Sequence, residues 1–233
     1  MNLPLAGSAL ATRLLGPASP QTLVTFGAGR QISAHLDLLI RTLPIKHCTI
    51  INRSHSAQFE ALHANLQKRF GYVTFNSELL DSPQLEAVVS SADIICTATP
   101  STKPLFKSKW VKSGTHINLV GSYTPEMAEV DEELIKRAGK ILVDSREACL
   151  VEAGELISAQ LAPENLIEIG ETVGLDGTEI PERLDAIKMA GDITIFKSVG
   201  VGIQDTVITT AVLDKAISLR IGVQIPRYEG EMT

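Results

Sequence analysis

The chain has 233 residues, of which 44% are hydrophobic and 21% are charged, and its formal net charge is −6. This composition is not that of a disordered segment, and the length allows one or two domains with a buried core. An acidic balance disfavours sequence-independent binding to nucleic acid or to an anionic membrane surface. No apolar run approaches the ~18 residues of a membrane span. We therefore expect neither nucleic acid nor a membrane as a partner.

The cysteines and the start of the chain bear on its cellular compartment. Cys48, Cys96 and Cys149 are far apart, and the first two lie in apolar, strand-like runs. We interpret them as reduced core residues, because they form no disulfide framework and the histidines have no metal-ligand spacing with them. No basic region precedes the first apolar residues, so no secretory signal is expected. These features predict a cytoplasmic protein without a metal site.

The first predicted elements are a helix, a strand and a second helix. Residues 3–15 are rich in Ala and Leu and predict a helix that ends at Gly16-Pro17. The apolar, β-branched run at 23–26 predicts the first strand. An amphipathic stretch that begins near Ile32 predicts the second helix.

The turn between this strand and this helix contains Gly27-Ala28-Gly29. A strand, a tight glycine turn and a helix are how a nucleotide-binding βαβ unit begins. Gly27 allows the sharp turn, Gly29 lets a pyrophosphate approach the backbone, and the N–H groups at the helix start favour its negative charge. The third position of the fingerprint is Ile32 and not Gly or Ala, so an ordinary βα turn is the alternative when the motif is taken alone.

Predicted strands and helices alternate over residues 22–145. This alternation predicts an α/β fold with a doubly wound parallel sheet of the Rossmann type. Ligands of such sheets bind at the carboxyl ends of the strands, and four of these ends contain glycine or polar residues, which supports a dinucleotide site. The further predicted strands are 48–51, 72–75, 93–97, 115–120 and 140–143, with helices at 56–70, 79–89 (capped by Ser77) and 131–138 and a helical turn at 106–111.

The pattern is less regular beyond residue 145. An acidic helix is predicted at 147–159 and a short helical piece at 166–173. Residues 175–190 are polar and predict a loop. A strand at 192–196 and a long apolar helix at 203–221 complete the predicted elements.

Six stretches together resemble the ornithine cyclodeaminase/mu-crystallin family. The blocks at 114–131 and 193–205 are the most specific of them, and the similarity runs from about residue 5 to residue 221. The resemblance implies an NAD(P)-dependent enzyme of amino acids or cyclic imines, and a homodimer. The stretches are VTFGAGRQ at 24–31, INRS at 51–54, TATPS at 97–101, GTHINLVGSYTPEMAEVD at 114–131, VDSREA at 143–148 and ITIFKSVGVGIQD at 193–205.

The resemblance also implies a division into domains. Residues 18–200 correspond to the NAD(P)-binding Rossmann domain, and the terminal segments 1–17 and 201–233 correspond to a remnant of the substrate/dimerisation domain. The family's N-terminal segment has no counterpart here, and Arg13 is the only Lys or Arg before the first strand. We therefore expect the family's carboxylate-binding residues to be missing and both terminal helices to lack their usual packing partners.

Tyr123 marks a second departure from the family. Cyclodeaminases carry an Asp at this position, two residues after the glycine that ends the fifth strand. A phenol with an unperturbed pKa of ~10 donates a proton but is a poor base near pH 7. Tyr123 is therefore the candidate catalytic residue for protonating an imine, and its presence disfavours cyclodeamination.

The residues after the second strand bear on cofactor choice. NAD-binding folds carry an acid here for the ribose 2′-hydroxyl, whereas this chain has Asn52, Arg53 and Ser54. The guanidinium fork of Arg53 and the Ser54 hydroxyl suit a 2′-phosphate. We predict NADP(H), with NAD(H) as the second choice; a solvent-facing Arg53 is the alternative.

The other candidate cofactor-binding residues follow the strand ends. Arg30 and Gln31 join the glycines near the diphosphate, although Arg30 is equally consistent with a solvated surface residue. The threonines of the fourth strand are also explained by β propensity alone. The resemblance adds Ser198 and Val199 as contacts of the nicotinamide. The full set is Gly27, Gly29, Arg30, Gln31, Asn52, Arg53, Ser54, Thr97, Thr99, Asn118, Leu119, Val120, Ser198 and Val199.

The function implied is an NADP(H)-dependent oxidoreductase that acts on C–N bonds, as an imine or ketimine reductase or an amino-acid dehydrogenase. Its substrate is an amino acid or a cyclic imine. The alternatives are an ammonia lyase of the cyclodeaminase type and a non-catalytic NAD(P)-binding protein. The chain is also compatible with being part of a longer enzyme.

Overall fold

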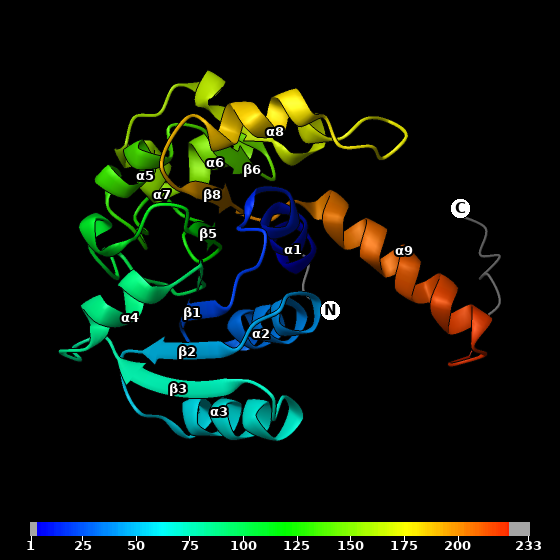
Figure 1. Ribbon diagram of the computed structural model, residues 1–233. Coiled ribbons are helices and arrows are strands. Elements are labelled where there is room, and N and C mark those ends of the chain that lie inside the picture. Colours follow the sequence, from blue (N-terminus) through cyan, green and yellow to red (C-terminus); the bar gives the residue numbers. More distant parts are fainter. Residues whose placement is uncertain (1–3, 224–233) are drawn as a thin grey trace, which may run out of the picture.

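A single sheet of eight parallel strands forms the centre of the computed structural model, which describes residues 4–223 (Figure 1). The strands lie in the order β3-β2-β1-β4-β5-β8-β6-β7. The strand order reverses between β1 and β4, and this leaves a crevice at their carboxyl ends. The predicted α/β fold with a doubly wound parallel sheet is confirmed. The strands are β1 (Thr22–Phe26), β2 (His47–Asn52), β3 (Thr74–Leu79), β4 (Ile94–Thr97), β5 (His116–Leu119), β6 (Ile141–Val143), β7 (Leu166–Glu168) and β8 (Thr194–Lys197).

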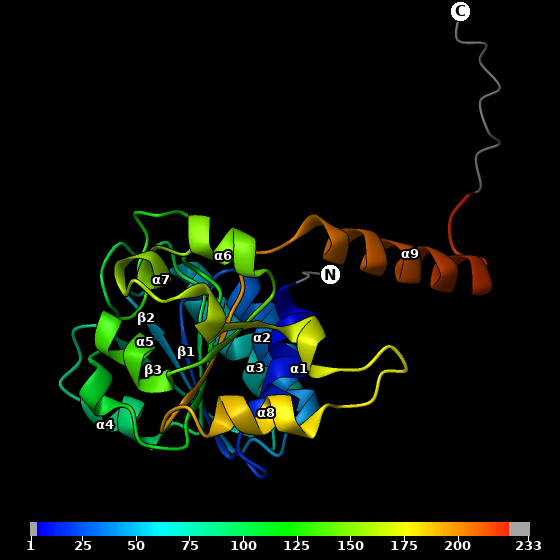
Figure 2. The same cartoon turned by 90° about the horizontal axis from the view of Figure 1, so that it is seen from above.

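Helices cover both faces of the sheet (Figures 1 and 2). One face is packed by α1, α2, α3 and α8, and the other by α4, α5, α6 and α7. Three short 3-10 turns lie at Ser108–Trp110, Pro163–Asn165 and Ile169–Thr172. The helices are α1 (Pro4–Leu15), α2 (Arg30–Thr42), α3 (Ala57–Arg69), α4 (Leu85–Ser91), α5 (Glu132–Ala138), α6 (Arg146–Glu152), α7 (Gly154–Ser158), α8 (Pro181–Lys188) and α9 (Gly202–Ser218).

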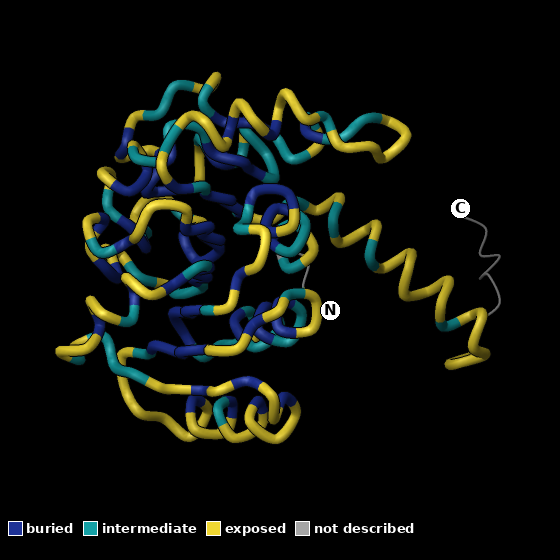
Figure 3. The backbone as a smooth tube through the Cα atoms, in the orientation of Figure 1, coloured by how far each residue is buried: buried dark blue, intermediate teal, exposed yellow. Residues whose placement is uncertain are grey.

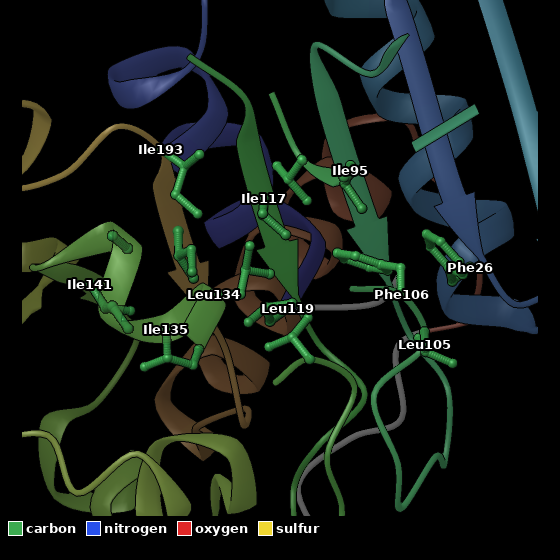
Figure 4. Packing of buried hydrophobic residues seen from close by; sticks show 14 of the residues in the cluster. Phe26, Ile95, Leu105, Phe106, Ile117, Leu119, Leu134, Ile135, Ile141 and Ile193 are labelled. Atoms are coloured by element: carbon green, nitrogen blue, oxygen red, sulfur yellow. The ribbon is translucent and has the colours of Figure 1, made fainter. Parts of the chain in front are cut away.

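The strands supply apolar side chains to both of these faces. Successive side chains of a strand point to opposite sides, so Val24 and Phe26 pack with α4–α7 whereas Leu23 packs with α2 and α3. Figure 4 shows the first of these clusters, in which the ring centroids of Phe26 and Phe106 lie 5.0 Å apart. Burial on both faces explains why the strands are nearly continuous apolar runs in the sequence (Figure 3).

The third strand and the helix after it lie later in the chain than predicted. β3 comprises Thr74–Leu79 and not 72–75, and α4 comprises Leu85–Ser91 and not 79–89. Ser77 therefore lies within a strand, paired with Ile50 of β2. β3 is an edge strand that exposes several of its residues, and its length is fixed by pairing with β2, which a local apolar pattern does not reveal.

The region after β6 also departs from the prediction. Residues 175–190 are not a loop throughout, because Pro181–Lys188 form α8; this helix buries only two residues, so its apolar stripe is too narrow to recognise. The helical piece predicted at 166–173 is the strand β7 followed by a 3-10 turn. The helix predicted at 147–159 is divided into α6 and α7 at Ala153.

The two terminal helices differ in their packing. The expectation of missing partners is wrong for α1, because Ala11, Leu14 and Leu15 are buried in a cluster with Phe196 of β8. By contrast, α9 buries none of its residues and projects from the rest of the fold (Figures 2 and 3). The part of the predicted helix 203–221 beyond Ser218 lies outside α9. The division into domains at residues 18 and 200 stays a prediction.

Among residues 4–223, no helix is long and apolar enough to cross a membrane.

Candidate functional site

A first cavity of about 450 Å³ lies at the carboxyl ends of β1, β2 and β4. It is the crevice expected where the strand order reverses. The cavity brings together six of the predicted cofactor-binding residues, which come from three separate loops. These are Gly27, Gly29, Asn52, Arg53, Ser54 and Thr99.

The glycine turn has the geometry that a diphosphate requires. Gly27 has φ of 109°, a conformation that side chains disfavour, and a Cβ there would lie 3.1 Å from the Ala98 carbonyl oxygen. A Cβ on Gly29 would meet no atom within 4 Å, so the space above this residue is open. Gly29 is also the N-cap of α2 and provides no side-chain cap, which leaves the first N–H groups of that helix free to bind an anion. The Gln58 amide Nε2 donates to the Ala28 carbonyl at 2.9 Å and braces the turn.

The loop after β2 carries the predicted 2′-phosphate site. The Asn52 amide Nδ2 donates to the Ser54 carbonyl at 2.8 Å, so Asn52 shapes the turn. Arg53 and Ser54 are exposed at the edge of the first cavity. Within the described part of the chain, no side chain forms an ion pair or a hydrogen bond with Arg53. Its guanidinium is therefore available to an anionic ligand.

A second cavity of about 310 Å³ lies at the ends of β4, β5 and β8. It shares Ala98, Thr99 and Pro100 with the first cavity, so the two together form an elongated site. Tyr123 lies on its rim with 51% of its surface exposed. The Gln31 Oε1 atom is buried without a hydrogen-bond partner in the described residues, which leaves it able to accept from a ligand. The lining residues also include Val120, Gly121, Ser198 and Val199.

Glu129 is a site residue that the sequence interpretation missed. Its buried carboxylate accepts hydrogen bonds from the Thr97 hydroxyl (2.6 Å), the Thr99 N–H and hydroxyl (2.6 and 2.8 Å) and the Gly121 N–H (2.7 Å). Burial raises the pKa of Glu129, against the opposing effects of Lys197 and of these donors. Glu129 thus fixes the loops after β4 and β5 relative to each other, between the two cavities. The sequence held no local signal for this, because the donors lie 8 to 32 residues away in the chain, on two different loops.

A second buried charge pair lies close by. Lys197 and Glu155 are both fully buried, and the lysine Nζ lies 3.1 Å from the glutamate Oε1. Lys197 also interacts electrostatically with Glu129. Burial of a charged lysine is costly unless compensating charge lies beside it, so these three residues form one unit at the end of β8.

Several predicted residues do not line either cavity. Asn118 is buried and its amide donates to the Thr12 hydroxyl of α1 at 2.9 Å. Leu119 lies in the apolar core, and Thr97 is buried on Glu129. Arg30 is exposed in a separate surface groove between α2 and α3. Asn118, Leu119 and Thr97 therefore support the site without lining it. The side chains of a strand point toward the helices that cover the two faces of the sheet and not along the strand toward its end.

His116 of β5 has a structural role. It is fully buried, and its Nδ1 lies 2.9 Å from the Thr194 hydroxyl of β8. Burial lowers the pKa of His116 to about 4, so the side chain is neutral near pH 7. No cluster of three or more metal-ligating side chains is found within residues 4–223.

Comparison with known proteins agrees with this geometry. Residues 5–219 match the family described as "Ornithine cyclodeaminase/mu-crystallin family". The chain belongs to this family. Ketimine reductase mu-crystallin of Macropus fuliginosus is 34% identical over 209 residues, which are 90% of this chain and 60% of that protein. Delta(1)-pyrroline-2-carboxylate reductase of Colwellia psychrerythraea is 35% identical over 210 residues, which are 89% of this chain and 63% of that protein.

Solved structures of the family share the fold. An archaeal alanine dehydrogenase dimer with bound NAD superposes with a TM-score of 0.76 at 26% identity, covering 97% of this chain and 66% of that one. Delta(1)-pyrroline-2-carboxylate reductase of Thermococcus litoralis, in complex with NADH and L-proline, has a TM-score of 0.77 at 24% identity and covers 95% and 66%. The chain therefore spans only 60–66% of the length of these relatives.

Proposed function

We propose that the chain is the cofactor-binding part of an NADP(H)-dependent oxidoreductase that acts on C–N bonds, as an imine or ketimine reductase or an amino-acid dehydrogenase. The observation that carries this proposal is the pair of adjoining cavities at the strand ends, one with an open glycine turn and a free arginine, the other with polar and apolar walls. The relatives named as ketimine and pyrroline-2-carboxylate reductases support the choice of reaction.

Different residues along the elongated site bind different parts of the cofactor and the substrate. The N–H groups at the start of α2 hold the diphosphate, with Gly29 leaving room for it. Thr99, which lines both cavities, would hold the part of the cofactor that joins its two ends. The walls of the second cavity hold the ring that supplies the hydride and keep water from it. Tyr123, on the rim, donates a proton to the imine nitrogen of a small substrate.

Arg53 selects NADPH over NADH in this proposal. The test is a titration of the purified protein with each nucleotide, followed by nicotinamide fluorescence, for the native chain and for Arg53→Ala. Loss of a charge-assisted hydrogen bond weakens NADPH binding by about 10- to 100-fold and leaves NADH binding nearly unchanged. Arg13→Ala, which removes an exposed arginine paired with Glu179 away from both cavities, is the matched control.

Three outcomes of this titration are informative. Tight NADPH binding that depends on Arg53 supports the proposal. Equal affinities for the two nucleotides that do not change in the variant would remove the role of Arg53. No binding of either nucleotide would contradict the cofactor-binding function itself.

The role of Tyr123 is tested in a protein that catalyses imine reduction. Tyr123→Phe is expected to lower the rate of imine reduction by about 100-fold, the usual contribution of a general acid, with the nucleotide affinity unchanged. A release of ammonia without net change in the cofactor would indicate cyclodeamination in place of reduction.

The proposal includes a homodimer and a cytoplasmic location. Support for the dimer comes from α9, whose residues Val207, Leu213 and Ile217 are 61%, 57% and 60% exposed. Leu213→Glu is expected to lower the mass measured by sedimentation to that of a monomer. The cytoplasmic location is supported by the three buried cysteines, all of which are free thiols, and fractionation of cells tests it.

A further inference from the structure

Asp144 binds the loop that follows β8 through several hydrogen bonds. Its carboxylate lies at the end of β6 and accepts hydrogen bonds from the Val199 N–H (3.1 Å), the Gly200 N–H (2.8 Å) and the Ser198 hydroxyl (2.7 Å). It also accepts from the N–H of its own neighbour Ser145, at 2.9 Å. Gly200 has φ of 86°, which lets the backbone turn its N–H toward the same carboxylate.

This arrangement fixes the direction of two carbonyl groups. In a trans peptide the C=O and the N–H point in opposite directions in one plane, and the described residues contain no cis peptide. The Val199 N–H and Gly200 N–H both point at Asp144, so the Ser198 and Val199 carbonyls point away from it. Ser198 and Val199 line the second cavity and Asp144 does not. No N–H or O–H group within residues 4–223 donates to either carbonyl oxygen.

The surroundings keep Asp144 in its place. The Cys149 thiol lies 3.6 Å from its Oδ1 atom. Burial and the nearby carboxylate raise the pKa of Cys149, so this neighbour stays protonated and donates. Both carboxylate oxygens of Asp144 therefore accept from donors that hold it in this orientation.

We infer that Asp144 is a positioning residue for the cofactor: by binding the N–H groups of the 198–200 loop, it turns the Ser198 and Val199 carbonyls into the second cavity as acceptors for the amino group of the nicotinamide carboxamide. This inference rests on the proposed function. According to this inference, the preference for a carboxamide over a ring substituent without N–H donors depends on Asp144, which does not touch the ring.

The experiment compares two cofactors that differ only at this group. Calorimetry measures the binding of NADP⁺ and of its 3-acetylpyridine analogue, in which a methyl ketone replaces the carboxamide and no N–H remains. The native chain is expected to bind NADP⁺ about 3- to 10-fold more tightly, the worth of one hydrogen bond. In Asp144→Asn, whose amide cannot accept from all of these donors, the two affinities become equal within a factor of about two.

The control is Asp93→Asn, a carboxylate just before β4, at the amino ends of the strands, that likewise accepts two backbone N–H groups, those of Gln21 and Thr22. This variant keeps the native preference. Asp144→Glu, which retains the charge and moves it by one methylene, provides the measurement if Asp144→Asn does not fold, and it lowers the preference as well.

Each other outcome overturns the inference. An undiminished preference in a folded Asp144 variant removes the positioning role. Equal binding of the two nucleotides by the native chain shows that no acceptor meets the carboxamide, while the binding itself leaves the proposed function intact. Failure of the native chain to bind either nucleotide overturns both.

Discussion

The two halves of the elongated site are built in opposite ways. The half at β1 and β2 leaves its backbone N–H groups free at the start of α2 and its arginine exposed. The half at β5 and β8 has its N–H groups bound by carboxylates: the buried Glu129 binds the loops at Thr99 and Gly121, and the partly buried Asp144 binds the loop at 198–200.

This difference follows from the parts of the ligand that each half receives. A diphosphate is an anion that needs free donors and a helix N-terminus. A nicotinamide ring, which carries no negative charge in either redox state, is held by shape and by acceptors, and a free N–H beside it would be an unsatisfied buried group. The comparison predicts that substitutions of the free, ligand-facing groups in the first half weaken binding without loss of stability, whereas substitutions of the carboxylates and their partners in the second half lower the stability of the fold.

The largest expected effect is that of Lys197→Met. It leaves Glu155 and Glu129 without their buried counter-charge and is expected to lower the free energy of unfolding by about 3–5 kcal/mol. Urea denaturation followed by circular dichroism measures it. Lys136→Met, which removes an exposed lysine paired with Glu132, leaves the free energy nearly unchanged. A Lys197→Met protein as stable as the native chain would contradict the idea that the second half depends on buried charge.

Glu129→Gln is expected to cost about 1–3 kcal/mol of stability, because one backbone donor is left without an acceptor. Thr99 N–H and Gly121 N–H bind different carboxylate oxygens, so either orientation of the amide places its NH₂ group against one of them. Thermal denaturation measures the change, with the exposed Glu126→Gln as the control. Equal melting temperatures for the two variants would show that the hydrogen bonds of Glu129 to the loops after β4 and β5 are not needed for stability.

The glycine turn offers a matched pair within the first half. Gly27→Ala is expected to lower stability by about 1–2 kcal/mol because of its positive φ. Gly29→Ala has room for its methyl group and ordinary backbone angles, so it keeps the native stability while weakening nucleotide binding by about 10-fold or more. Denaturation and fluorescence titration separate these effects, and a Gly29→Ala protein with native affinity would exclude a diphosphate at this turn.

The smallest expected effect lies behind the second half, where α1 supports β5. Thr12→Val leaves the Asn118 amide without its acceptor and is expected to cost about 1 kcal/mol. Thr210→Val makes the same replacement in the exposed helix α9 and has little effect, because the Thr210 hydroxyl donates only to the Thr206 carbonyl of its own helix. Similar unfolding midpoints for both variants would mean that α1 does not brace the site.

The sequence by itself determined the fold class and the position of the first half. Alternation of apolar strands and amphipathic helices is a local pattern with a fixed period, and the parallel sheet follows from it. The glycine turn and Arg53 are adjacent to strand ends in the chain, so their place beside the crevice could be read from order alone. The same pattern did not reveal α8 or the extent of β3, since both depend on packing against elements distant in the sequence.

Only the tertiary structure decided how the second half is built. Glu129 binds Gly121, 8 residues away, Lys197 pairs with Glu155, 42 residues away, and Asp144 binds Gly200, 56 residues away; no spacing rule predicts such contacts. It also decided that Asn118 faces α1, because the face on which a strand residue lies depends on which layer packs there. The terminal helices show the same dependence on tertiary structure. Both are apolar in sequence, but α1 is buried because it packs against the sheet and α8, whereas α9 is exposed.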